Sequence, residues 1–148
     1  MNADMTDPDR IFLDTAFQLL RDMRKRYDAE AKAHDMTLSR ARALQKIEEN
    51  EGLTQTALAE ALAIETPTLN RLLDKLETGG FIERRQTDGD KRVRCIHLSD
   101  AGRPKAEQIR GFSSQLREEV FAGVTAAETQ AATRFIEKLL ANLERGRS

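Results

Sequence analysis

Residues 54–98 read TQTALAEALAIETPTLNRLLDKLETGGFIERRQTDGDKRVRCIHL and decide the fold. Their first half predicts two short helices on either side of a tight turn at Ala63–Glu65. Thr54 is a good N-cap for the first helix, because its hydroxyl can accept from a backbone N–H that the helix leaves unpaired. Thr66 is expected to cap the second helix, with Pro67 at the first helical position. This order indicates a helix-turn-helix.

The second half of the segment predicts a β-hairpin. Gly79-Gly80 permits the left-handed turn with which many helices end. Two strand-like runs follow, Phe81–Arg85 and Val93–Leu98, and the Asp-Gly pair in the loop Gln86–Lys91 favours a turn. A hairpin directly after a helix-turn-helix is the wing of a winged helix.

The hairpin is basic on both sides of this loop. Residues 84–94 include five basic and two acidic side chains, although the whole chain has a net charge of −1. Asp90 and Arg92 stand two apart near the tip, so the carboxylate can orient the guanidinium toward a phosphate or a minor groove. A charge run is usually a solvated surface. Beside a helix pair it favours contact with a nucleic-acid backbone, with an affinity that falls as salt rises.

The helix expected to follow Thr66 has an apolar and a polar face. The apolar stripe is Leu69, Leu72, Leu73 and Leu76. At 100° per residue the outward positions are Pro67, Arg71, Asp74 and Thr78, flanked by Thr68, Asn70 and Lys75. Arg can grip guanine, Asn can grip adenine, and Thr can contact a base edge or a phosphate. The alternative is an ordinary polar surface, which the adjoining basic wing makes the weaker interpretation.

Composition excludes several classes of protein. Charged residues make up 33% of the 148 positions and aromatics 5%, as expected for helices with long solvated faces. No apolar run is long enough for a membrane span, and the acidic N-terminal sequence is not a signal peptide. A single cysteine suits a reducing cytoplasm. We therefore expect a cytoplasmic protein that does not contact membranes.

Amphipathic helices are expected on both sides of the winged segment. Asp7 and Pro8 begin a helix that reaches about Ala33, and a second follows the cap at Thr37. Two further apolar stripes lie in the C-terminal third, at Ile109, Phe112, Leu116, Val120 and Val124, and at Phe135, Ile136, Leu139, Leu140 and Leu143. These helices could form a bundle within one chain. A dimer interface is the better account, because two-fold symmetry would present two recognition helices to a palindrome.

The chain resembles the MarR family of winged-helix regulators, most closely its SlyA-like branch. The resemblance rests on LTQTALAEALAIETPTLNRLLDKLETGGFIERR, then DGDKR, then HLSDAGR, which occur in the family's order and spacing. It implies a homodimer in which residues 1–36 and 99–148 form the dimer body and residues 37–98 form the DNA-binding lobe. The residues expected to contact DNA are Thr66, Pro67, Thr68, Asn70, Arg71, Lys75, Arg84, Asp90, Lys91, Arg92 and Arg94.

Three positions depart from the family pattern. Ala63 stands where the turn often has glycine, so its backbone is expected to avoid the left-handed region. Cys95 replaces an Arg that many relatives carry, and Arg94 is the expected substitute. Pro104 lies beyond the first turn of a helix capped by Ser99, which predicts a kinked or delayed start.

The resemblance also implies that a small aromatic or anionic effector binds between the dimer body and the winged lobe. Met23, His34 and Arg40 are the predicted ligand residues, although His34 also suits a helix C-terminus. Cys95 and His97 share a strand face, but two ligands do not make a metal site. Cys95 beside Arg94 could be a redox thiol, whereas an ordinary half-buried cysteine is the simpler interpretation.

The sequence therefore predicts a mainly α protein with a small β-hairpin wing. We expect a homodimeric transcriptional repressor that binds palindromic duplex DNA, and the alternative is a winged domain used for protein–protein contact. No catalytic arrangement, cofactor motif or metal site is predicted.

Overall fold

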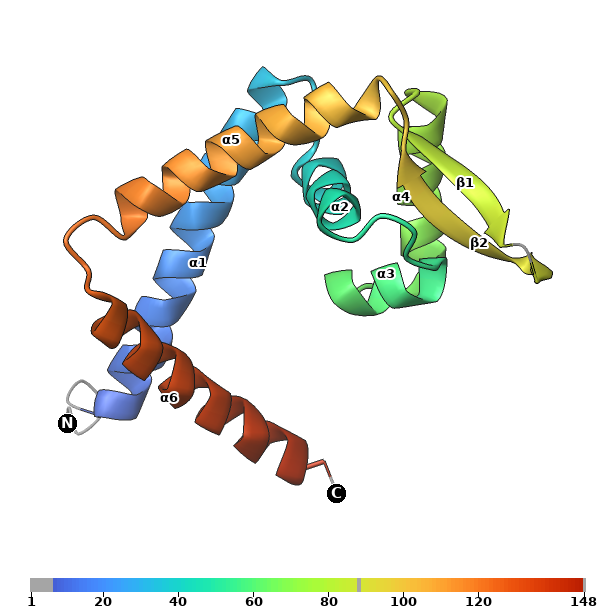
Figure 1. Ribbon diagram of the computed structural model, residues 1–148. Coiled ribbons are helices and arrows are strands. Elements are labelled where there is room, and N and C mark those ends of the chain that lie inside the picture. The colour runs from blue at the N-terminus through green and yellow to red at the C-terminus, as the bar shows by residue number, and fades with distance from the viewer. Residues whose placement is uncertain (1–6, 88, 148) are drawn as a thin grey trace. The chain divides into compact units, whose positions relative to one another are not determined.

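The computed structural model describes residues 7–87 and 89–147 (Figure 1). The described residues form six helices and one antiparallel hairpin: α1 (Pro8–Ala33), α2 (Leu38–Glu49), α3 (Gln55–Leu62), α4 (Thr66–Thr78), β1 (Ile82–Thr87), β2 (Asp90–Leu98), α5 (Gly102–Val120) and α6 (Ala126–Arg145). The chain divides after Ser114 into two compact units. The predicted fold class, mainly α with a hairpin wing, is confirmed. No helix among the described residues has the length and apolar character that crossing a membrane requires.

Side-chain caps set the first three helix starts where the sequence predicts them. The Asp7 carboxylate accepts from the N–H of Asp9 at 3.1 Å, and Pro8 opens α1. The hydroxyls of Thr37 and Thr54 accept from backbone N–H groups three residues further on, at 3.3 and 3.2 Å. Each bond satisfies a donor that the first helical turn leaves without a partner. The positions of α1, α2 and α3 thus follow from local chemistry.

The start of α4 differs from the prediction by one residue. Glu65, not Thr66, is the N-cap, and it makes no side-chain cap bond. Thr66 is the first helical residue and Pro67 the second, because the Glu65 carbonyl already accepts from the N–H of Leu69 at 3.0 Å. Proline is tolerated there, since N–H groups of the first turn have no helical acceptor. The expected Thr66 cap is therefore wrong.

The prediction for Ala63 is also wrong, because its backbone is left-handed, with φ 53° and ψ 46°. This conformation ends α3. The N–H groups of Ala63 and Ile64 donate to the carbonyls of Glu60 and Ala59, both at 3.1 Å. A residue with a Cβ in this region costs about 1–2 kcal/mol. Tertiary packing of α3 against α4 imposes the turn in spite of that cost.

One core joins the helices of the winged lobe to the root of the hairpin. The predicted apolar stripe of α4 is buried there apart from half-buried Leu72, and Leu44 and Ile47 of α2 and Leu58 of α3 pack with it. Full burial of a Leu or Ile side chain contributes about 1.5–3 kcal/mol. The largest fully buried side chains are Leu44, Ile47, Leu58, Leu69, Leu73, Leu76, Ile96 and Ile109.

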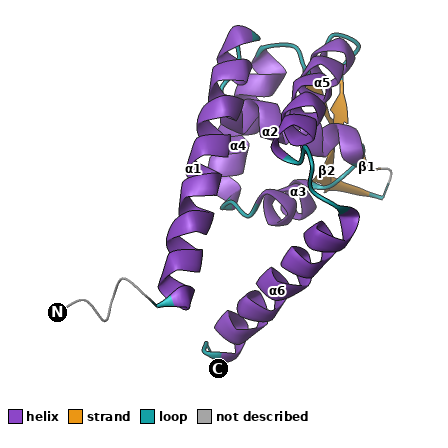
Figure 2. Cartoon of the chain, turned by 90° about the vertical axis from the view of Figure 1, so that its left-hand side faces the viewer, coloured by secondary structure: helices purple, strands orange, loops and turns teal. Residues whose placement is uncertain are grey.

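The hairpin is longer than predicted and is anchored at its root. Its strands pair from Ile82↔Leu98 to Thr87↔Asp90, with a register shift between Gln86 and Thr87. Near the root, the Ile96 N–H donates to the Leu53 carbonyl, and the Ile96 carbonyl accepts from the Gly52 N–H, both at 2.9 Å. Figure 2 shows the two strands as one hairpin at the edge of the helices of this lobe. The root is thus held on the segment that precedes α3.

The second unit, residues 115–148, contains α6. A capping box starts this helix: the Thr125 hydroxyl accepts from the Glu128 N–H at 3.2 Å, and the Glu128 carboxylate accepts from the Thr125 N–H at 2.8 Å. No described residue of α6 is buried. Its exposed large apolar side chains are Phe135, Ile136, Leu140 and Leu143. Helix α1 likewise exposes Ile11, Leu13, Phe17, Leu19 and Leu20.

Candidate nucleic-acid interface

Helix α4 presents an exposed polar face with two flanks. The predicted outward and flanking residues are all exposed, namely Pro67, Thr68, Asn70, Arg71, Asp74, Lys75 and Thr78, and Thr66 is exposed as well. Asn70 and Asp74 lie one helical turn apart on the flank nearer the hairpin. Thr68, Arg71 and Lys75 lie on the other flank, beside the start of α2. The hairpin borders one flank and α2 borders the other, so the two flanks have different neighbouring side chains.

The hairpin flank of α4 is held by Arg84 of β1. The Arg84 Nη2 atom donates to Oδ1 of Asp74 at 2.6 Å and to the carbonyl of Asn70 at 3.3 Å. Its Nε atom lies 3.9 Å from a carboxylate oxygen of Glu77. Only 10% of the Arg84 side chain is exposed, against 65% of the Asp74 side chain. The structure thus places this predicted DNA contact in ion pairs with the acids of α4.

A second contact reaches the same flank from α3. The side-chain amide nitrogen of Gln55 donates to the side-chain oxygen of Asn70. With its oxygen engaged by this donor, the side-chain amide nitrogen of Asn70 is left to donate to a ligand. Gln55 is not among the residues predicted from the sequence. The sequence signal that could have identified Gln55 is its polar side chain at the first position of α3, the helix that precedes α4.

The other flank of α4 borders a groove of about 360 Å³ against the start of α2. Arg71 and Lys75 line it from α4, and Arg40 and Arg42 line it from α2. The Arg40 Nε atom is shielded from water and has no hydrogen-bond partner among the described residues. No carboxylate from the described part of the chain lines this groove. Arg42 is a further cation that was not predicted at the site.

The wing tip carries the contact that the Asp90–Arg92 spacing predicts. Oδ1 of Asp90 accepts from the backbone N–H of Arg92 at 2.9 Å and from its Nε at 3.5 Å. The Arg92 side chain is 93% exposed. Arg94 is exposed as well, whereas the side chain of Lys91 lies outside the described part of the structure. Arg92 is therefore both oriented by an acid and open to a ligand.

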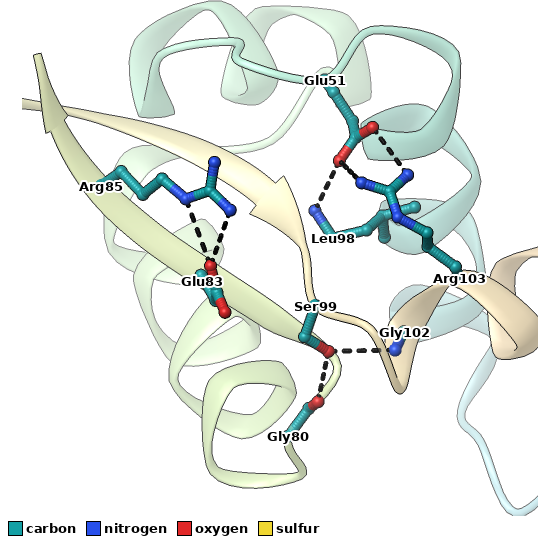
Figure 3. Close-up of polar contacts among 8 residues, drawn as sticks. All are labelled: Glu51, Gly80, Glu83, Arg85, Leu98, Ser99, Gly102 and Arg103. Atoms are coloured by element: carbon teal, nitrogen blue, oxygen red, sulfur yellow. Dashed lines mark hydrogen bonds and ion pairs between the residues drawn. The ribbon is translucent and has the colours of Figure 1, made fainter.

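The root of the wing is fixed to α5 by a polar cluster (Figure 3). The Glu51 carboxylate accepts from both terminal nitrogens of Arg103, at 2.9 and 3.1 Å, and from the N–H of Leu98 at 3.0 Å. The Arg103 hydrogen bond is the main cause that lowers the pKa of Glu51, and desolvation opposes it. The same pair raises the pKa of Arg103.

Ser99 connects the hairpin root to the beginning of α5. Its hydroxyl donates to the carbonyl of Gly80 at 2.5 Å and accepts from the N–H of Gly102 at 3.0 Å (Figure 3). A Cβ on Gly102 would lie 1.9 Å from the carbonyl oxygen of Phe81, so only glycine fits this approach. Helix α5 begins at Gly102, which confirms the delayed start predicted from Pro104.

The predicted effector residues do not converge on one cavity. Met23 lines a groove of about 450 Å³ with Tyr27 and Arg42, between α1 and α2. The ring of His34 stacks on Phe112 at 5.7 Å instead. Arg40 lines the groove beside α4. Sequence spacing could not distinguish these three environments.

Cys95 and His97, the weaker candidates, lie on one face of β2 and are half-buried. Among the residues that the structure describes, no group of three His, Cys, Asp or Glu side chains could hold a metal ion.

Comparison with known proteins agrees with this architecture. Residues 36–93 match the model of the MarR family. A MarR-family regulator from Silicibacter pomeroyi is 26% identical with a TM-score of 0.72, and the match covers 84% of each chain. A MarR protein from Peptoclostridium difficile is 24% identical with a TM-score of 0.80, over 99% of this chain and 94% of that one.

A third solved structure is the S. aureus MepR–DNA complex. It is 23% identical with a TM-score of 0.76, over 87% of this chain and 96% of that one. Residues 36–93, which include the helix-turn-helix and most of the wing, thus match the MarR family, and the chain shares the winged helix-turn-helix fold of solved MarR-family transcriptional regulators.

Proposed function

We propose that the protein is a homodimeric transcriptional repressor that binds palindromic operator DNA, with α4 in the major groove and the hairpin wing on the adjoining minor groove or backbone. One observation carries this proposal: the exposed polar face of α4 lies between a cationic groove on one side and the hairpin, with its exposed Arg92, on the other. MepR, which shares the fold, was solved with DNA.

Base recognition is assigned to Asn70 and Arg71. Both are exposed in the first two turns of α4, where a helix entering the major groove meets base edges. Arg71 can donate two hydrogen bonds to guanine O6 and N7. Thr66, Thr68 and Lys75 are assigned to backbone positioning, which fixes the register without reading sequence. Arg94 and Lys91 extend the wing's phosphate contacts.

The dimer rests on apolar surface that a single chain leaves uncovered. Phe17 and Leu20 of α1 are 62% and 63% exposed, and Leu140 and Leu143 of α6 are 54% and 66% exposed. Several large apolar side chains exposed on one helix mark an interaction site. A second copy of the chain is the simplest partner, because an isologous interface buries the same faces twice. The resulting symmetry explains why the operator is expected to be a palindrome.

The resemblance to the MarR family is the reason to propose that a small effector molecule controls DNA binding. The groove between α1 and α2 combines the apolar side chains of Leu20, Met23 and Tyr27 with the cations Arg24 and Arg42. Such a lining suits a small aromatic anion. An effector would release DNA only by binding more tightly to the dimer conformation whose recognition helices cannot span the two half-sites.

A mobility-shift titration on DNA from upstream of the protein's own gene, at two salt concentrations, tests the proposal. Wild type should bind, and its affinity should fall steeply as salt rises. Arg92→Ala should weaken all sequences about equally, whereas Arg71→Ala should also relax base preference. The alternative, a winged domain for protein contact, requires that wild type and both variants bind duplexes equally weakly.

A further inference from the structure

A continuous cationic surface extends from the recognition helix onto α1. The groove beside α4 shares Thr37 and Ser39 with a groove of about 450 Å³ at the start of α2, which Arg21, Arg24 and Lys25 line from α1. This groove is not the one that Met23 and Tyr27 line. The cations that line the two grooves are Arg21, Arg24 and Lys25 of α1, Arg40 and Arg42 of α2, and Arg71 and Lys75 of α4. We name these residues and the two shared ones the α1–α2–α4 surface.

The α1–α2–α4 surface lacks the compensating acids that cations have elsewhere in the first unit. Arg110 is 2.6 Å from Glu48, and Arg103 is 2.9 Å from Glu51. Within the described residues, none of the cations on the surface forms an ion pair. Among the same residues, the one carboxylate that lines either groove, Asp28, is 3.0 Å from Lys32. The surface therefore carries an uncompensated positive charge.

Two further features favour an anion here. The surface includes the N-terminal end of α2, where Thr37 and Ser39 lie beside backbone N–H groups that the helix cannot pair. The Nε–H of Arg40 is shielded from water and has no acceptor among the residues described. Arg40 therefore adds a positive charge that no described protein acceptor compensates at its Nε–H.

We propose that the α1–α2–α4 surface binds phosphates of duplex DNA on the side of the α4 groove opposite the wing. The inference rests on the proposed function, since it extends the footprint of the same duplex. Phosphates recur along a DNA strand, so they match cations spread over three elements and two grooves. One small anion cannot contact all seven cations at once, and the groove proposed for the effector shares only Arg24 and Arg42 with this surface. Arg71 and Lys75 belong to both the recognition helix and this surface, which makes the contact with one duplex continuous.

Neutralising the α1 cations tests the proposal. The variant R21Q/R24Q/K25Q leaves every residue of α4 and the wing unchanged. Its matched control is R134Q/K138Q/R145Q, which removes the same charge from exposed positions of α6. Fluorescence anisotropy with the operator across salt concentrations gives the slope of log affinity against log salt. Removing one phosphate-binding cation should reduce that slope by about 0.9.

The α1 variant is expected to lose about 1–3 units of slope per subunit with unchanged base preference, whereas the α6 control keeps the wild-type slope. Trimming flanking base pairs should weaken wild type but have little effect on the α1 variant. Equal slopes for variant and control would overturn the proposal. A small-anion site would also overturn it. In that case DNA binding would not depend on duplex length, and inorganic phosphate at constant ionic strength would displace DNA from wild type but not from the α1 variant.

These outcomes separate the two proposals. If wild type prefers its operator over a scrambled duplex while the α1 variant behaves as its control, the proposed function stands and the flanking contact is refuted. If wild type binds no duplex at low salt, both are refuted. Circular dichroism and gel filtration of each variant confirm that fold and assembly are retained.

Discussion

The guanidinium of Arg84 on β1 lies 2.6 Å from the carboxylate of Asp74 on α4, and this ion pair joins the wing to the recognition helix. Without it, an uncompensated acid would face the DNA backbone from the helix that is proposed to enter the groove. Arg84 also reaches the carbonyl of Asn70. Its role is therefore expected to be positioning and charge compensation, not direct phosphate binding.

Arg84→Ala should weaken operator binding about tenfold, because Asp74 and Glu77 are then left uncompensated beside phosphates. The salt slope should change little, since the number of phosphates that the protein neutralises stays the same. Adding Asp74→Ala should restore much of the affinity. A double-mutant cycle measured by anisotropy gives this coupling directly. Additive effects of the two substitutions, or a slope reduced by about one unit, would assign Arg84 to phosphate binding instead.

Gln55→Ala should reduce base discrimination at one position in each half-site. The Gln55 amide orients Asn70 so that a donor faces the groove, and a good base contact is worth about 1–3 kcal/mol. Gln55→Glu should change the preferred base, because a carboxylate accepts from Asn70 and turns its oxygen outward. Thr56→Ala, on the exposed surface of α3, is the control. Binding to a library with each operator position randomised measures these preferences; an unchanged profile for both Gln55 variants would contradict the assignment.

The Glu51–Arg103 pair should make stability depend on pH in the acid range. The pKa of Glu51 is lowered from its ordinary 4.5, mainly by Arg103, so the folded state favours the ionised form. Its contribution is complete above that ordinary value and disappears as pH falls through the lower folded pKa. Urea unfolding at fixed protein concentration should show Glu51→Gln less stable than wild type at pH 7, with a smaller difference below about pH 4. A difference independent of pH would exclude this role.

Ala63→Gly should stabilise the protein by up to about 1 kcal/mol. Glycine relieves the left-handed strain of about 1–2 kcal/mol, and its larger unfolded-state entropy cancels part of the gain. Thermal unfolding checks the sign, with Ala61→Gly in the interior of α3 as a control that should destabilise. A lower melting temperature for Ala63→Gly would show that the strain is absent in solution.

The sequence predicted the elements because their determinants are local. Thr37 and Thr54 act as caps through backbone groups three residues away, and the leucines of α4 reveal their buried face by spacing alone. Ala63 was mispredicted because tertiary packing overrode a local preference. The Thr66 cap was misplaced because the carbonyl of Glu65, which has no side-chain cap bond to reveal it, already begins the helix.

The sequence predicts most residues of the candidate DNA-binding site, but it does not predict which of their side chains pair with one another. Arg84 and Asp74 are ten residues apart, and they meet only because the chain reverses at Gly79-Gly80. The α1 cations could not be assigned to the α4 side of the molecule, because their position depends on how α1 packs on α2. Charge counted along the sequence therefore found the wing and missed the α1–α2–α4 surface.

Helix α4 is proposed to read base sequence in a duplex, and the ratio of affinities for the operator and for a scrambled duplex of equal length tests this reading. Wild type should prefer the operator by at least about 10³-fold at physiological salt. Arg71→Ala should reduce that ratio by about 5- to 100-fold, while Lys138→Gln on α6 leaves it unchanged. Equal affinity of wild type for the two duplexes would contradict the account.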